Sequence, residues 1–131
     1  MYRYIYSKGN SDIVSDKLCY HCTKHGNADK IVTQGFKLDP NSGACCLSPS
    51  LEHAQDYGTE CVACKRDDVL KLKLYNYDES LGFDPKKYAA DCQGIIQPWY
   101  NGDQSCPIYH IFDIPALNSV VTWIRYPKGD R

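Results

Sequence analysis

The chain has 131 residues, of which 15 are Lys or Arg and 16 are Asp or Glu, so its net charge is −1. This length predicts a single globular domain spanning residues 1–131. The balanced charge gives no basic excess for nonspecific binding of nucleic acid or an anionic membrane. The apolar runs are too short to cross a membrane, and the first residues, Met-Tyr-Arg-Tyr-Ile-Tyr, lack the apolar core of a secretion signal.

Short helices and strands follow one another in an irregular order along the chain. The predicted strands are residues 2–6, 17–22, 44–47, 60–64, 69–77, 108–114 and 120–126. The predicted helices are residues 28–34 with Asn27 as cap, a helix from Ser48-Pro49 to Gly58, and a helix from Asp84-Pro85 to Gly94. Residues 93–103 are a predicted loop, and residues 115–118 a single turn. Because strands and helices do not alternate regularly, we expect an α+β fold with a mostly antiparallel sheet.

Eight cysteines are present, and four of them form two Cys-x-x-Cys motifs, Cys19/Cys22 and Cys61/Cys64. Both motifs lie in predicted strands, where residues three apart face opposite sides, so each pair is badly placed to chelate one metal ion. We therefore expect no zinc site. Three interpretations stay open: buried free thiols in a reducing compartment, which we favour, disulfide bonds in an exported protein, and a structural zinc site.

Three stretches occur in an order that is typical of one enzyme superfamily. They are Leu18-Cys19-Tyr20-His21-Cys22-Thr23 with a helix ending in Gly35-Phe36, then Gly43-Ala44-Cys45-Cys46-Leu47-Ser48 with a helix ending in Tyr57-Gly58, and finally Ile108-Tyr109-His110-Ile111-Phe112-Asp113. The order resembles the ADP-ribosyltransferase superfamily, on its diphtheria-toxin-like or poly(ADP-ribose)-polymerase-like side. In that family the corresponding motifs read "Leu-Tyr-His-Gly-Thr", "Gly-x-Tyr-Phe-Ser" and "Ala-x-x-Tyr-Gly", and a late strand carries a Glu. The resemblance implies the split, mostly antiparallel β-sheet with short helices of that superfamily.

The resemblance also implies a binding site for NAD as co-substrate. His21 would hydrogen-bond a ribose hydroxyl, the backbone of Cys22 would hold the nicotinamide amide beside Thr23, and Tyr57 would stack on the nicotinamide ring. Ser48 would lie near the carboxamide. Cys46 takes the place of a Tyr of the family motif.

The late strand departs from the family pattern because it lacks the catalytic Glu. In this chain the position of that Glu is taken by Ile108, or, as the second choice, by His110. The loss removes an electrostatic contribution to the transition state, unless a relocated acid such as Asp113 or Glu60 supplies it. We therefore expect transfer of single ADP-ribose units, with weak activity or none.

The acceptor is unknown, and the balanced charge favours a protein over a nucleic acid. We expect a monomer that does not bind membranes. The free-thiol interpretation favours an intracellular protein, with a secreted effector as the alternative. The alternative function is a non-enzymatic, cysteine-rich interaction module, zinc-stabilised or disulfide-bonded, that uses the aromatic loop around Trp99 and Tyr100.

Overall fold

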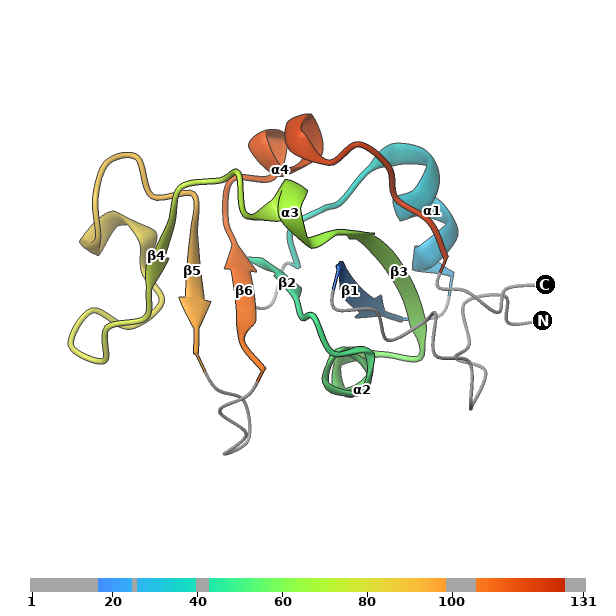
Figure 1. Ribbon diagram of the computed structural model, residues 1–131, viewed down its shortest axis with the longest axis horizontal. Coiled ribbons are helices and arrows are strands. Elements are labelled where there is room, and N and C mark those ends of the chain that lie inside the picture. Colours follow the sequence, from blue (N-terminus) through green and yellow to red (C-terminus); the bar gives the residue numbers. More distant parts are fainter. Residues whose placement is uncertain (1–16, 25, 40–42, 99–105, 127–131) are drawn as a thin grey trace.

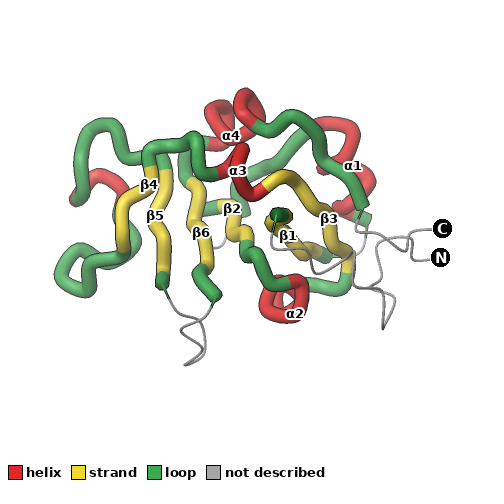
Figure 2. Tube along the Cα trace, viewed as in Figure 1, coloured by secondary structure: helices red, strands yellow, loops and turns green. Residues whose placement is uncertain are grey.

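Two β-sheets and a set of short helices make up the protein in the computed structural model, which describes residues 17–24, 26–39, 43–98 and 106–126 (Figure 1). The strands are β1 (Leu18–Thr23), β2 (Cys45–Leu47), β3 (Glu60–Lys65), β4 (Leu74–Asn76), β5 (Gly94–Gln97) and β6 (Ile108–Ile111). The α-helices are α1 (Asn27–Gln34), α2 (Leu51–Ala54), α3 (Arg66–Val69) and α4 (Ile114–Val120), with 3₁₀ turns η2 (Gln55–Tyr57) and η3 (Pro85–Lys87). Helices and sheets are intermixed along the chain (Figure 2), so the predicted α+β class is confirmed.

The first sheet is the antiparallel pair β1–β3, and the second has the strand order β2-β6-β5-β4. Among the described pairs, only β4 and β5 run parallel, so the prediction of a mostly antiparallel sheet is also confirmed. Tyr20 and Ser48 exchange backbone hydrogen bonds of 2.7 and 2.9 Å. This bridge joins the end of β2 to β1 and brings the two sheets together.

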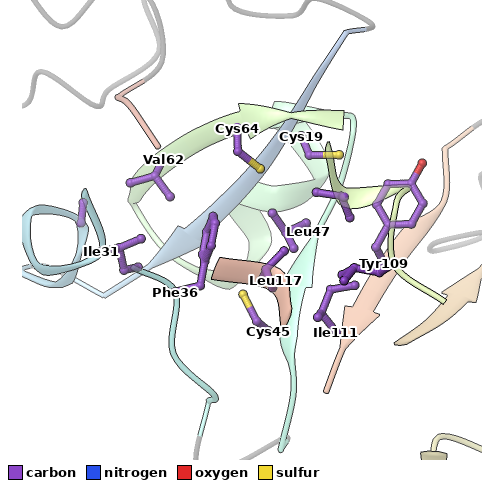
Figure 3. Close-up of a cluster of buried hydrophobic side chains, with 13 residues drawn as sticks. Cys19, Ile31, Phe36, Cys45, Leu47, Val62, Cys64, Tyr109, Ile111 and Leu117 are labelled. Carbon is purple, nitrogen blue, oxygen red and sulfur yellow. The ribbon is translucent and has the colours of Figure 1, made fainter. Parts of the chain in front are cut away.

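The main core lies where the two sheets meet α1 and α4 (Figure 3). Side chains alternate along a strand, so Cys19 and His21 of β1 face one side and Tyr20 and Cys22 the other. The core side holds the buried residues Cys19, Phe36, Cys45, Leu47, Val62, Cys64, Tyr109, Ile111 and Leu117. The other side of β1 and β3 packs on α2 through the buried residues Tyr20, Cys22, Leu51, Ala54, Cys61 and Ala63.

The predicted strand over residues 69–77 was wrong for its first half, where the chain forms α3 and then a turn. Val69 and Leu72 are buried while Leu70 is 45% exposed, which is the three-residue spacing of a helical turn rather than the alternation of a strand. The buried Asp68 reinforces this turn by accepting hydrogen bonds from the backbone and hydroxyl of Thr122. Only Leu74–Asn76 pairs as a strand, β4.

Four further predictions were wrong, wholly or in part, in the second half of the chain. The expected helix from Asp84-Pro85 is only the 3₁₀ turn η3, and the expected loop over residues 93–103 begins with β5. The expected strand over residues 120–126 is mostly irregular, with one backbone bridge from Arg125 to Ala63. The predicted strand 108–114 ends at Ile111, because Asp113 caps α4 and Pro115 occupies its first turn.

The caps of the first two helices also differ from those expected. Ser50, rather than Ser48, caps α2 by accepting the amide of His53 at 3.2 Å. Asn27 does not cap α1, because the carboxylate of Glu60 accepts the amides of Gly26 and Ala28 at 2.8 and 3.1 Å. The predicted strand 2–6 and the aromatic pair Trp99 and Tyr100 lie outside the described residues.

Candidate functional site

A pocket of about 370 Å³ opens beside the C-terminal end of β1. Its walls come from β1, from α1, from the segment that follows α1 and from η2. The lining residues are His21, Cys22, Thr23, Lys24, Asn27, Lys30, Ile31, Lys37, Leu38, Asp39 and Tyr57. Four of these residues, His21, Cys22, Thr23 and Tyr57, were candidates from the sequence, and the fold brings them together in one cavity of a size typical of ligand sites.

His21 has a fixed orientation and a fixed tautomer at this pocket. Its Nδ1 lies 2.7 Å from the backbone carbonyl oxygen of Cys46, and its ring packs edge-on against Phe36 at a centroid distance of 5.9 Å. Since a carbonyl only accepts hydrogen bonds, Nδ1 carries the proton. Burial lowers the pKa of His21, partly offset by the bond to Cys46 and by the charge of Asp39. The neutral ring therefore has an unprotonated Nε2, which can accept a hydrogen bond from a hydroxyl.

Tyr57 also forms part of the wall and is 44% exposed. Its position depends on the next residue, Gly58, which packs directly on the backbone of β1. A Cβ atom at Gly58 would lie 2.1 Å from the carbonyl oxygen of Thr23, a distance that no side chain tolerates. The glycine thus allows η2 to approach β1 closely and places the Tyr57 ring at the pocket.

Cys22 and Thr23 form the β1 side of the pocket. Cys22 makes a disulfide with Cys61, its direct partner in the antiparallel register. The favoured interpretation that the cysteines are free thiols is therefore wrong for this pair, while Cys19, Cys45, Cys46, Cys64, Cys92 and Cys106 are free. The Thr23 hydroxyl accepts a hydrogen bond from the side-chain Nδ2 of Asn27 at 3.2 Å, which ties β1 to the start of α1.

The pocket is lined by three lysines, Lys24, Lys30 and Lys37, and one carboxylate, Asp39. These residues were not candidates from the sequence, and their spacing along the chain carries no signal that they share a cavity. Lys37 donates a hydrogen bond to the Gln34 side chain at 3.2 Å. The overall charge of −1 thus conceals a local cationic lining that suits an anionic ligand.

Four other candidates do not line this pocket. Ser48 is 1% exposed, and its hydroxyl accepts the amide of Ser50 at 3.0 Å and contacts Cys106 Sγ at 3.3 Å. Ile108 is fully buried in β6. The side chains of Cys46 and His110 contact each other on the second sheet at 3.4 Å, and only the backbone of Cys46 reaches His21.

The two acids that could have replaced the missing Glu are both used as helix caps. Glu60 is 2% exposed and caps α1. Asp113 accepts the amide of Ala116 at 3.1 Å and a hydrogen bond from Gln93 at 3.2 Å. Asp39 is therefore the carboxylate that the described lining offers to a ligand.

The two Cys-x-x-Cys motifs lie in strands, as expected, and these two strands pair with each other. Cys19 and Cys64 face the main core, while Cys22 and Cys61 face α2, so the four sulfurs are divided between the two faces of the sheet. Within the described ranges no cluster of three or more His, Cys, Asp or Glu side chains could hold a metal ion. No helix there is long and apolar enough to cross a membrane.

Comparisons with known proteins identify no relative of this chain. No family model matches it, and neither the curated proteins nor the solved structures contain a match.

Proposed function

We propose that the pocket beside His21 binds NAD and that the protein is an ADP-ribosyltransferase-like enzyme of low activity. The observation that carries the proposal is that His21, Cys22, Thr23 and Tyr57 line one cavity. These residues come from β1 and from a turn that follows α2, and the motifs of the ADP-ribosyltransferase superfamily selected them together. His21, Cys22 and Thr23 are neighbours in β1, so the independent support is that Tyr57, from a later motif, lines the same cavity.

The chemistry of the lining suits the parts of NAD. The exposed Tyr57 ring offers a π face for the flat, cationic nicotinamide. The unprotonated Nε2 of His21 would accept a ribose hydroxyl, because its Nδ1 proton is engaged by Cys46. Lys24, Lys30 and Lys37 would meet the negative charge of the pyrophosphate.

The reaction would be slow transfer of a single ADP-ribose to an acceptor, which we propose is a protein. The bond between ribose and nicotinamide breaks, nicotinamide leaves, and an acceptor nucleophile attacks the ribose carbon. The family places a Glu where this chain has the buried Ile108, so no side chain at that position would polarise a ribose hydroxyl. Elongation to a polymer would therefore be absent.

Titration of NAD into the purified protein, with nicotinamide release followed by chromatography, tests the proposal. Replacing Tyr57 by Ala should weaken NAD binding about 5- to 100-fold, the contribution of one aromatic stack, whereas Tyr57→Phe should retain binding. His21→Ala should abolish turnover. Leu70→Ala is a matched control, because Leu70 is exposed to a similar extent, 45%, but lies outside the pocket. Failure of the wild type to bind NAD, or long polymers in its products, would overturn the proposal.

A second candidate is a non-enzymatic, disulfide-bonded interaction module, favoured by the Cys22–Cys61 disulfide. Such bonds persist in exported proteins, which is the setting of a secreted effector. A protein with an intact disulfide and no affinity for NAD would support this candidate over the transferase.

A further inference from the structure

A cysteine, a histidine and a glutamine form a hydrogen-bonded series on the second sheet, separate from the pocket lining. Cys46 Sγ lies 3.4 Å from His110 Nδ1, and His110 Nε2 lies 2.9 Å from the Gln97 side-chain oxygen. This is the arrangement of a nucleophile, a base and a group that orients the base.

The strand register produces this arrangement. Cys46 of β2 and His110 of β6 are direct partners, and Gln97 of β5 lies two residues beyond Ile95, the other partner of His110. The three side chains lie on one face of the second sheet. The opposite face belongs to the main core, and in β2 and β6 it carries Cys45, Leu47, Tyr109 and Ile111. The backbone carbonyl of Cys46 is also held, by His21 Nδ1 at 2.7 Å. Cys46 is thus held through both its backbone and its side chain.

The hydrogen bonds determine where the protons lie. Because the amide oxygen of Gln97 only accepts, His110 Nε2 carries the ring proton and Nδ1 has a lone pair facing Cys46. Burial lowers the pKa of His110 to about 4. Burial, with a smaller effect of the Asp39 carboxylate, raises the pKa of Cys46 to about 11. At neutral pH the pair is an uncharged thiol that donates to an uncharged imidazole.

Access distinguishes this thiol from most of the others. Cys46 is partly exposed, whereas Cys19, Cys45, Cys64 and Cys106 are buried. The aromatic ring of Phe83, itself 43% exposed, packs against His110 at a centroid distance of 4.6 Å and forms an apolar wall. Cys92 is also partly buried and free, but its thiol donates to the carbonyl of Gly94 and has no imidazole partner.

We infer that Cys46, His110 and Gln97 form a nucleophilic thiol site that takes small, uncharged carbon electrophiles. Cys46 Sγ attacks the electrophilic carbon, the S–C bond forms and the bond from that carbon to its leaving group breaks. The thiol proton passes to His110 Nδ1 and then to water. The negative charge of Asp39 acts on Cys46 and disfavours anionic reagents. This inference does not depend on NAD binding.

Alkylation of the full-length protein by iodoacetamide, with each cysteine quantified by peptide mass spectrometry, tests the site. In this reaction iodide is the leaving group. Cys46 should react first, at least about tenfold faster than Cys92 at pH 6, because His110 can take the thiol proton as the S–C bond forms and the Cys92 thiol has no imidazole partner. Its rate should be nearly constant from about pH 5 to pH 9, since the base is already deprotonated and the thiol still protonated. Iodoacetate should react with Cys46 more slowly than iodoacetamide, relative to the same reagents on free cysteine.

Two variants separate base catalysis from mere accessibility. His110→Ala should remove the pH plateau and slow alkylation of Cys46 by at least about tenfold, and added imidazole should restore part of the rate. Gln97→Leu should slow the reaction without exposing the thiol, and it decides the question if the His110 variant does not fold. A Cys46 rate that rises tenfold per pH unit in the wild type would overturn the inference. So would alkylation of Cys92 ahead of Cys46, or an undiminished rate in folded His110→Ala.

Discussion

His21 Nδ1 lies 2.7 Å from the carbonyl oxygen of Cys46, a residue 25 positions later in the chain. This contact links β1 of the first sheet to β2 of the second and leaves Nε2 of His21 as an acceptor. Because the partner is a backbone atom, the side chain at position 46 is free to take part in another interaction, with His110. One residue therefore connects the pocket to the thiol site.

The close packing of Gly58 on β1 predicts a large effect of adding a methyl group there. Gly58→Ala should lower the free energy of unfolding by about 1–3 kcal/mol, because the new Cβ would collide with the Thr23 backbone. It should also weaken NAD binding, since Tyr57 moves with the turn. Chemical denaturation and NAD titration measure the two effects. Gln55→Ala, an exposed change in the same turn, should alter neither, and a Gly58→Ala protein of wild-type stability would contradict the packing.

The buried Asp68 holds the segment after α4 to α3. Its carboxylate accepts hydrogen bonds from Thr122 N at 2.9 Å, Thr122 Oγ1 at 2.8 Å and Lys71 Nζ at 3.2 Å. Burial alone would raise the pKa of Asp68, but these hydrogen bonds outweigh it and lower the pKa. Asp68→Ala should therefore cost about 2–3 kcal/mol of stability in urea denaturation. Asp67→Ala, at an exposed position of the same helix, is the control and should cost little.

The Cys22–Cys61 disulfide predicts a definite thiol count and a stability difference. Alkylation in denaturant without reductant should label six cysteines, and all eight after reduction. The bond closes a loop with a sequence separation of 39, so replacing both cysteines by Ala should cost about 2–4 kcal/mol. Cys92→Ala, which removes a free thiol, should leave stability nearly unchanged. Eight labelled cysteines before reduction would show that the disulfide is absent.

The buried histidines predict that stability falls on acidification. Burial lowers the pKa of His110 to about 4 and also lowers the pKa of His21, whereas an unfolded histidine titrates near 6.5. Between about pH 6.5 and pH 4 the unfolded chain thus binds more protons, and His110 should account for a loss of about 2–3 kcal/mol. The lowered pKa of Asp68 also makes stability fall on acidification, but at lower pH, below the range in which an ordinary carboxyl group titrates.

Denaturation midpoints measured across this pH range check the prediction. His110→Phe keeps an aromatic ring next to Phe83 but cannot titrate, so its stability should depend less on pH than that of the wild type. Identical pH profiles for the two proteins would rule out His110 as a source of the effect.

The strands with clear local patterns were predictable from the sequence. β1, β2 and β3 lie within a residue or two of their expected positions, and α1 ends at Gly35 as expected, where φ is +95°. Aromatic and β-branched residues favour an extended chain, and a glycine stop depends on the chain's own geometry. β5 was missed, because Gly94-Ile95-Ile96-Gln97 is too short to show a period and stands next to Pro98.

The candidate site could be predicted from the sequence only in part. The order of motifs selected His21, Cys22, Thr23 and Tyr57, which do share a pocket, but it also selected Ser48 and Ile108, which are buried elsewhere. The lysines of the lining had no motif to mark them. Whether a residue faces a cavity depends on how segments distant in sequence pack together, and no local pattern records it.

By itself the sequence determined the fold class, the main strands of the first sheet and the division of each Cys-x-x-Cys motif between two faces, since all follow from local periodicity and turn chemistry. Only the tertiary structure decided that Cys22 pairs with Cys61, that Glu60 caps α1, and that Cys46 meets His110. These contacts depend on strand register and on the packing of one sheet against another. Register is set by the whole buried surface, so it is not encoded in any single segment.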